Sequence, residues 1–295
     1  MPGLLLVYMY NLDLDASKYA YYAALGLRHR GDRLCYAALT DGKFETGCLD
    51  PWSSEISMPK ARAVLISIGD ENSMYVDKDI AIAVDGACTP NDVARLFSSE
   101  EKLEQSIKLI KSVKPKCTFI ALSRKGCFLA FRDQLGVRPL VYGGYGFDGL
   151  ILASETAPIV LAGGKPARDL RPGEIVYGDE YELQFEEVST DMKPHICLFE
   201  YVYLARPDSI LDSVNVYMFR RTMGEILAEK HYVDVDVVVG VPETAIPYAI
   251  GYAEKKKARL EYGFISTIGR LRTAIVRTTI EDRLRLLSLK LNLVP

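Results

Sequence analysis

The sequence predicts an α+β domain followed by an α/β domain, a fold class indicated by three features of its hydrophobic pattern. Early in the 295-residue chain, short apolar runs alternate with Gly- and Pro-containing turns, which is typical of antiparallel sheets. Towards the end, helical patterns flank the nearly continuous Val run Val235 to Val241, which is typical of a buried parallel strand. The apolar, aromatic segment Cys197 to Ser209 between them is too hydrophobic for a flexible linker and predicts a packed joint. We therefore expect domains at residues 1–192 and 193–295.

The first domain is expected to be rich in strands, each a run of apolar or β-branched residues bounded by turn residues. The expected strands cover residues 4–10, 34–40, 63–68, 80–84, 118–122, 127–131, 137–142, 150–153, 174–177 and 181–187. Asp41-Gly42, directly after the strand 34–40, is a hairpin signal. Helices are expected from a Ser17 cap to Leu27, from Thr89 towards Pro115, and after Ser154.

The second domain is expected to contain two helices and two strands. One helix starts at Ser213, the strand 235–241 follows, Pro242-Glu243-Thr244 opens the next helix, and residues 262–267 form a second strand. Two strands are too few for a stable sheet with helices on both faces. The sheet therefore needs a cover, for which self-association is the simplest source and a separate subunit the next.

Composition excludes several functional classes. A net charge of -3 and a pI near 5.8 indicate neither a nucleic-acid partner nor an anionic membrane, and no apolar run is long enough to span a bilayer. The cysteines, at positions 35, 48, 88, 117, 127 and 197, and the three histidines are dispersed without the spacing of a metal site. We expect a cytoplasmic protein with reduced thiols, no metal and no cofactor.

Residue patterns alone offer few candidates for chemistry. The tetrad 28–31, Arg-His-Arg-Gly, reads as a basic helix end at a surface turn. Glu243, after a buried strand and at a helix start, is placed where α/β sheets bind ligands, although it could equally complement the helix dipole. The basic stretch that includes Arg270, Arg272 and Arg277 could hold phosphate groups or form a solvated face.

Separated segments along nearly the whole chain resemble the glutamine phosphoribosylpyrophosphate amidotransferases, enzymes of purine nucleotide biosynthesis. These segments are 25–31, 132–140, 153–155, 168–174, 198–209, 216–217, 223–224, 241–244 and 290–292. Arg132 to Leu140, which reads Arg-Asp-Gln-Leu-Gly-Val-Arg-Pro-Leu, and the joint are the most specific of them. The resemblance implies a four-layer αββα glutaminase domain of the N-terminal-nucleophile type, followed by a phosphoribosyltransferase domain.

The glutaminase half departs from the family at three positions of the implied site. The family nucleophile is an N-terminal cysteine in Cys-Gly-Ile, whereas this chain reads Met1-Pro2-Gly3-Leu4. The family's oxyanion-hole pair Asn-Gly matches Asp85-Gly86, which places a carboxylate where an amide N–H should face the oxyanion. The acidic segment 67–72 replaces the glutamine-binding Arg-Tyr-(Ser/Pro)-Thr. We therefore expect no glutaminase activity and assign no catalytic residue.

The phosphoribosyltransferase half is expected to be incomplete. In the family, the loop that grips phosphoribosylpyrophosphate follows Lys-Leu-Asn-Pro-Val, whereas this sequence stops at Lys290 to Pro295. Arg272-Thr273 resembles part of the family's flexible loop and is a candidate phosphate- or nucleotide-binding element. Cys197 matches an iron–sulfur ligand of some members, whose other ligands lie further along, so no cluster is expected.

Three functions follow from these expectations. The first is a catalytically silent protein of purine biosynthesis that regulates or completes an amidotransferase, as a homo-oligomer or bound to an amidotransferase subunit. The second is an active subunit completed by a separate C-terminal chain. The third is a nucleotide- or phosphate-sensing module built on the arginines Arg270, Arg272 and Arg277.

Overall fold

The computed structural model describes residues 1–53, 57–70, 72–97, 103–188, 194–231, 233–266 and 279–294. The chain forms two compact units, which we call unit 1 (Met1–Leu198 with Ile210–Ser213) and unit 2 (Phe199–Ser209 with Val214–Pro295). The domain boundary expected between residues 192 and 193 lies outside the described residues. Within the described parts of the chain, no helix combines the length and apolarity needed to cross a membrane.

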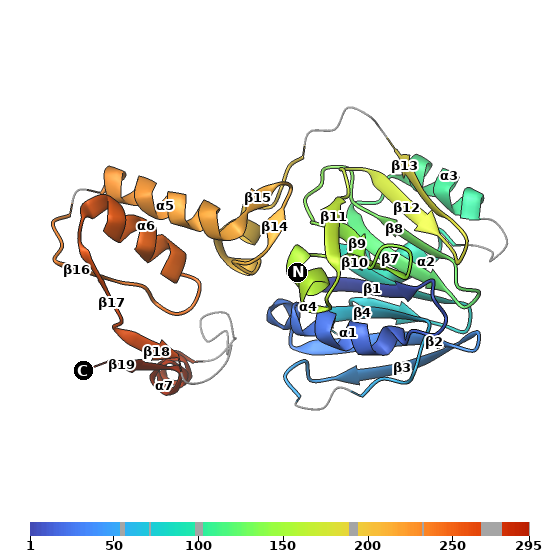
Figure 1. The fold of residues 1–295 in the computed structure, drawn as a ribbon, viewed down its shortest axis with the longest axis horizontal. Helices are drawn as coiled ribbons and strands as arrows, with labels where there is room; N and C mark the ends of the chain where they lie inside the picture. The colour runs from blue at the N-terminus through green and yellow to red at the C-terminus, as the bar shows by residue number, and fades with distance from the viewer. Residues whose placement is uncertain are drawn as a thin grey trace. The chain divides into compact units, whose positions relative to one another are not determined.

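Unit 1 is built on two antiparallel sheets (Figure 1). One has the strand order β11-β9-β10-β1-β4-β2-β3 and the other β13-β12-β8-β7-β6-β5. The first contains β1 (Gly3–Met9), β2 (Arg33–Thr40), β3 (Lys43–Leu49), β4 (Ala63–Gly69), β9 (Val141–Gly144), β10 (Gly149–Ala153) and β11 (Lys165–Asp169). The second contains β5 (Met74–Val76), β6 (Ile80–Gly86), β7 (Cys117–Ser123), β8 (Phe128–Phe131), β12 (Glu174–Gly178) and β13 (Leu183–Glu187).

Helices cover the outer face of each sheet. Helices α1 (Ala16–Leu25) and α4 (Thr156–Leu161) pack on the first sheet, and α2 (Pro90–Ala94) and α3 (Leu103–Val113) on the second (Figure 1). The expected Ser17 cap of α1 is wrong by two residues, because the side chain of Asp15 accepts the Ser17 N–H at 3.1 Å. The four-layer αββα arrangement is confirmed.

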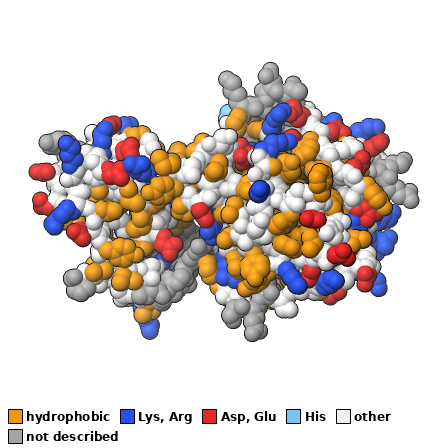
Figure 2. All heavy atoms as spheres, in the orientation of Figure 1, with side chains coloured by type: hydrophobic (Ala, Val, Ile, Leu, Met, Phe, Trp, Pro, Cys, Tyr) orange, Lys and Arg blue, Asp and Glu red, His pale blue; other side chains and the backbone are white. Residues whose placement is uncertain are grey.

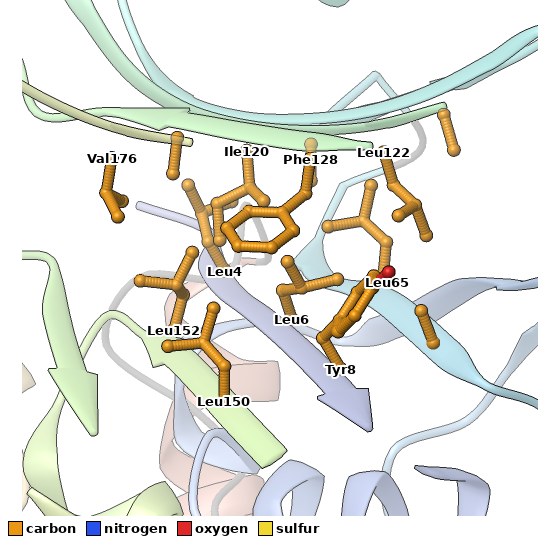
Figure 3. Packing of buried hydrophobic residues seen from close by; sticks show 14 of the residues in the cluster. Leu4, Leu6, Tyr8, Leu65, Ile120, Leu122, Phe128, Leu150, Leu152 and Val176 are labelled. Atoms are coloured by element: carbon orange, nitrogen blue, oxygen red, sulfur yellow. The ribbon is translucent and has the colours of Figure 1, made fainter. Parts of the chain in front are cut away.

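The core of unit 1 lies between the two sheets, and β1 runs through its centre. Leu4, Leu6 and Tyr8 point from β1 towards side chains of the second sheet such as Ile120 and Phe128 (Figure 3). The alternate residues of β1 are also fully buried, on the face that α1 covers. A strand buried on both faces is held by packing on each side, so the residues at its two ends are fixed in position as well.

Four of the six cysteines form disulfides, so the expectation of reduced thiols is wrong for them. Cys35 and Cys48 are cross-strand neighbours on β2 and β3, and Cys88 is bonded to Cys117 at the start of β7. Cys127 and Cys197 take no part in these two disulfides. Spacing along the chain conceals these pairs, because strand register decides which cysteines meet.

Unit 2 contains helices α5 (Val216–Lys230), α6 (Ile246–Lys256) and α7 (Ile280–Lys290). Its strands are β15 (Val214–Asn215), β16 (Val237–Val239), β17 (Arg259–Glu261), β18 (Phe264–Ser266) and β19 (Leu291–Leu293). Two short single-turn elements, η1 (Arg28–Arg30) in unit 1 and η2 (Glu200–Leu204) in unit 2, and β14 (Ile210–Leu211) in unit 1 complete the described fold.

Three expectations for unit 2 are corrected. The helix expected from Ser213 begins at Val216, because the side chain of Asn215 caps it by accepting the Met218 N–H at 2.9 Å. The parallel partner of β16 is β17, whereas β18, the strand expected near 262–267, pairs antiparallel with β19. Strand β16 is not buried on both faces, since Val237 and Val239 are each 38% exposed.

Candidate functional site

The candidate site of unit 1 lies where β1 begins, and glycines let the backbone pack closely there. A Cβ on Gly3 would lie 3.0 Å from Arg30 Cδ, and one on Gly69 would lie 2.9 Å from Pro2 Cβ. Both distances are shorter than packed side chains tolerate. The start of β1 is therefore enclosed by η1 on one side and by the end of β4 on the other.

A buried charge cluster lies beneath this start. The Nε of Arg30 donates to Glu155 Oε1 at 2.7 Å, and His29 Nε2 lies 2.6 Å from the same oxygen. Arg30 is 2% exposed and Glu155 is fully buried. The interpretation of residues 28–31 as a surface turn is therefore wrong for Arg30, because Glu155, 125 residues away in the chain, compensates its burial.

Asp85 and Gly86, the remnant of the oxyanion hole implied by the resemblance, end strand β6. Asp85 is 2% exposed, and its Oδ1 lies 3.4 Å from the Nε of Arg138. Gly86 has φ +139°, and a Cβ there would lie 2.7 Å from the Cα of Cys117. Position 86 thus requires glycine, and position 85 presents a buried carboxylate paired with a cation.

Arg138 is positioned by the loop that Asp133 organises. The carboxylate of Asp133 accepts the backbone N–H groups of Leu135, Val137 and Arg138 at 3.0–3.1 Å. It also accepts a hydrogen bond from the Thr118 hydroxyl at 3.2 Å. Thr118 is the residue of β7 that pairs with Asp85 of β6. Backbone donors satisfy this carboxylate, which leaves Asp85 as the acid that faces the Arg138 side chain.

Arg132, in the same segment, is a second buried cation. Its guanidinium donates to both carboxylate oxygens of Asp212, at 2.6 and 2.8 Å, and to the carbonyls of Gly136, Arg138 and Leu170. Burial opposes its charged form most strongly, but the hydrogen bond with Asp212 and the negative charges of Asp212, Asp169 and Asp133 together outweigh burial and raise the pKa of Arg132. The bidentate pair holds the Ile210–Ser213 segment against the loop after β8.

Two serines lie near Pro2. Ser67 donates to Ser73 Oγ at 2.8 Å, and Ser73 donates to the Asp70 carbonyl at 2.8 Å. The Ser73 carbonyl accepts the Val84 N–H at 3.0 Å, which links this turn to the residue before Asp85. Neither hydroxyl donates to a histidine or carboxylate, so neither is activated as a nucleophile.

The other predicted site residues are not brought to this place. Glu243 is exposed and precedes α6 in a turn of unit 2. Arg270, Arg272, Thr273 and Arg277 lie outside the described residues. Among the residues that the structure describes, there is no group of three or more side chains able to hold a metal ion.

Sequence reasoning missed the partners of these residues. Glu155 and Arg138 both lie within segments that carry the resemblance, but a motif does not show which side chains it faces. The only sequence signal for the pairs is indirect, because a buried Arg requires a partner acid and a buried Asp requires a cation. The Cys88–Cys117 bond, two residues after Gly86, had no such signal.

No family model matches the chain. It is 37% identical over 168 residues to the amidophosphoribosyltransferase of Archaeoglobus fulgidus, a match that spans 56% of this chain and 36% of that protein. It is 34% identical over 169 residues to the amidophosphoribosyltransferase of Bacillus subtilis, spanning 57% of this chain and 34% of the relative. The chain thus covers about a third of the length of these curated relatives.

Solved structures match over a larger part. The structure of glutamine phosphoribosylpyrophosphate amidotransferase from B. subtilis, complexed with ADP and GMP, matches with a TM-score of 0.82 at 25% identity. That match covers 99% of this chain and 72% of the solved chain. A second structure, described as the allosteric regulatory enzyme of purine biosynthesis, matches 99% of this chain with the same TM-score and identity. Both units therefore have counterparts in these structures.

Proposed function

We propose that this chain, a homologue of the amidophosphoribosyltransferases, acts in purine biosynthesis as a regulatory or structural partner and does not hydrolyse glutamine through unit 1. The observation that carries the proposal is the buried carboxylate of Asp85, paired with Arg138. In this proposal, unit 1 keeps the family fold while its site lacks the groups that amide hydrolysis requires.

The electrostatics at Asp85 oppose amide hydrolysis. The tetrahedral intermediate of that reaction carries an oxyanion, which preorganised N–H donors stabilise. A carboxylate in place of one donor repels this charge, and loss of a donor already costs about 3 kcal/mol of transition-state stabilisation. Arg138 carries a positive charge here, but its Nε faces Asp85 at 3.4 Å. The negative charge of Asp85 and the positive charge of Arg138 offset each other, which leaves little positive electrostatic potential to stabilise an oxyanion.

The residues at the start of the chain, where the family has its nucleophile, also argue against glutamine hydrolysis in unit 1. Neither Pro2, which packs against Gly69, nor Gly3 has a nucleophilic side-chain atom. The nearby hydroxyls of Ser67 and Ser73 are bonded to each other and to a backbone carbonyl. A site without an activated nucleophile supports binding or scaffolding in preference to covalent catalysis.

The partner role is supported by the apolar surface of unit 2. Val237, Val239 and Val241 around β16 are 38–45% exposed, and Leu260 of β17 is 46% exposed. Figure 2 shows apolar side chains gathered on the face of unit 2 turned to the viewer. A strand of this composition is normally covered on both faces. We propose a homo-oligomer or a complex with an amidotransferase subunit.

The same surface favours a second candidate, an active amidophosphoribosyltransferase subunit that a separate chain completes. In that case the added chain would extend the parallel pair β16–β17 and supply the phosphoribosylpyrophosphate loop. The nucleotide-sensing alternative depends on Arg270, Arg272 and Arg277, outside the described residues, and stays a prediction. A cytoplasmic location is also part of the proposal, and disulfides in that compartment are commonly redox-active.

The test measures ammonia release from glutamine by the purified full chain, with an active amidotransferase as positive control. We expect no release above the blank, because the site lacks a nucleophile and a complete set of oxyanion donors. Steady ammonia release that copurifies with the protein would contradict the proposal. Light scattering on the same sample checks the partner role, since one 32.9 kDa species at micromolar concentration would exclude self-association. Affinity capture from the native lysate then asks whether an amidotransferase subunit is bound.

A further inference from the structure

Helix α2 is too short to be stable by itself. It spans five residues, Pro90–Ala94, and a capping box closes its first turn. In this box Thr89 Oγ1 accepts the Asp92 N–H at 3.2 Å, and Asp92 Oδ2 accepts the Thr89 N–H at 3.0 Å. Because isolated helices of this length do not persist in water, contacts with the sheet must hold it. Those noncovalent contacts come mainly from the buried side chains of Pro90 and Val93.

A disulfide ties this helix to the sheet. Cys88 immediately precedes the cap residue Thr89, and Cys117, which is 1% exposed, opens strand β7. Their Cα atoms lie 5.6 Å apart. The adjacent backbone bond from Ala87 N–H to the Lys116 carbonyl, at 3.1 Å, ends the pairing between β6 and β7. Beyond it, the disulfide is the covalent link between the β6–α2 turn and the sheet.

A cavity of about 570 Å³ lies beside α2. Asn91, Ala94 and Phe97 line it on the α2 side, and Ala121 and Leu129 of β7 and β8 line it on the sheet side. Ala94 and Phe97 are only partly buried against the core on this side. The volume is in the range of small-molecule sites. Apolar side chains line both its helix side and its sheet side, and polar side chains also line it: Asp77, Asp79, Arg95, Ser106 and Ser123.

We propose that the Cys88–Cys117 disulfide is a redox-modification site that controls α2. Reduction by a dithiol releases α2 from the sheet and opens the adjacent cavity to a small apolar molecule. The inference does not rest on the proposed function, because it needs only the disulfide, the five-residue helix and the cavity. In this proposal, the segment that follows Gly86 and contains α2 is the part of unit 1 that moves.

The chemistry is a thiol–disulfide exchange with an external dithiol. A thiolate of the reductant attacks the sulfur of Cys88, which is partly exposed, and the Cys117 sulfur leaves as a thiolate that takes up a proton. The second thiol of the reductant then attacks its own sulfur in the mixed disulfide and releases Cys88. Two electrons and two protons reach the protein, and the reductant becomes a disulfide.

The second disulfide provides a matched control. Cys35 and Cys48 face each other within the β2–β3 ladder, and backbone pairing continues on both sides of them, from Leu34 with Leu49 to Thr40 with Lys43. Their reduction leaves the hairpin held by its own hydrogen bonds and by β4. Among the described residues that line the cavity, none belongs to β2 or β3.

The test uses the full chain and two paired variants, Cys88→Ser with Cys117→Ser, and Cys35→Ser with Cys48→Ser. Fluorescence of 8-anilinonaphthalene-1-sulfonate reports accessible apolar surface. We expect a several-fold higher signal for the first variant and for the wild-type protein treated with dithiothreitol. The second variant should stay at the level of the oxidised wild type until dithiothreitol reduces its remaining disulfide.

Hydrogen exchange locates the change and separates it from unfolding. Residues 88–97 should exchange at least tenfold faster after reduction, while β1 keeps its protection. Equal fluorescence of the two variants, an unchanged exchange rate at 88–97 or loss of protection in β1 would each overturn the proposal. So would mass spectrometry that finds Cys88 and Cys117 as free thiols in air-oxidised protein. If the first variant does not fold, the second variant before and after dithiothreitol supplies the same comparison, because Cys88–Cys117 is its remaining disulfide.

Discussion

Strands β1 and β16 have similar apolar composition and opposite surroundings. β1 pairs with β4 on one edge and β10 on the other, and all seven of its residues are buried. β16 pairs with β17, and two of its three valines are 38% exposed. The difference comes from the neighbours and not from the strands, because a side chain leaves water only when another element covers it.

The comparison indicates how each unit is stabilised. Unit 1 closes a core between two sheets and covers both outer faces with helices, so the side chains of its central strands are buried within the chain. Unit 2 has short two-stranded ladders and apolar residues left at its surface. Isolated two-stranded ladders are marginally stable in water. We therefore expect unit 1 to be the more stable unit and unit 2 to gain stability from a partner.

The largest expected effect comes from the buried charge of unit 1. Arg132→Met should lower the free energy of unfolding by about 3–5 kcal/mol, because Asp212 and the buried carbonyls of Gly136 and Leu170 lose their hydrogen bonds with the guanidinium. Urea denaturation followed by circular dichroism measures the change. Arg132→Lys keeps the positive charge but not the planar guanidinium that bonds both oxygens of Asp212, so it should recover only part of the lost stability. A change below about 1 kcal/mol for Arg132→Met would show that unit 1 does not depend on this clamp.

The second prediction compares the two strands directly. Val7→Ala in β1 should cost about 2–3 kcal/mol, because it opens a space in a fully buried site. Val239→Ala in β16 should cost less than about 1 kcal/mol, because the side chain is 38% exposed. Hydrogen exchange should likewise be faster in β16 than in β1. Equal costs would mean that β16 is covered in solution, which would itself indicate self-association.

The smallest expected effect concerns the ion pair between α3 and β13. The hydrogen bond from Lys111 lowers the pKa of Glu186, which also accepts the Tyr177 hydroxyl at 2.9 Å. A lowered carboxyl pKa stabilises the fold above the ordinary glutamate pKa of about 4.3 and loses this contribution as pH falls through the lower folded value. Glu186→Gln should therefore cost less than about 1 kcal/mol at neutral pH, since both side chains are partly exposed.

The check is a set of urea melts from neutral to acidic pH. The difference between wild type and Glu186→Gln should shrink as the solution becomes acidic. Glu182→Gln, on an exposed residue near the start of the same strand, serves as the control and should show little difference at any pH. A wild-type advantage that grew in acid would contradict the sign of this linkage.

Local sequence signals predicted much of unit 1 because they report local physics. Asp41-Gly42 predicted the turn that follows β2, and both residues adopt positive φ, at 50° and 72°. Thr89 and Asp92 predicted the start of α2. Strand β3, by contrast, was missed because its exposed, polar pattern lacks the apolar alternation of a half-buried strand.

The site was less predictable. The resemblance identified Asp85 and Gly86 by position, but not the Arg138 partner, the burial of Arg30 or the bond between Cys88 and Cys117. Each of these joins residues far apart in the chain. Side-chain type restricts which partners are acceptable, while strand register and loop geometry decide which partner is present.

By itself the sequence determined the fold class, the Asp41-Gly42 turn, the start of α2 and the similarity to amidophosphoribosyltransferases, because these depend on local pattern and on residue identity. The tertiary structure alone decided that Arg30 and Asp85 are buried with their charges paired, that four cysteines are bonded, and that β16 stays half exposed. Those properties depend on which surfaces face each other. A buried charge or an exposed valine is a property of its neighbours, and neighbours are assigned only when the chain has folded.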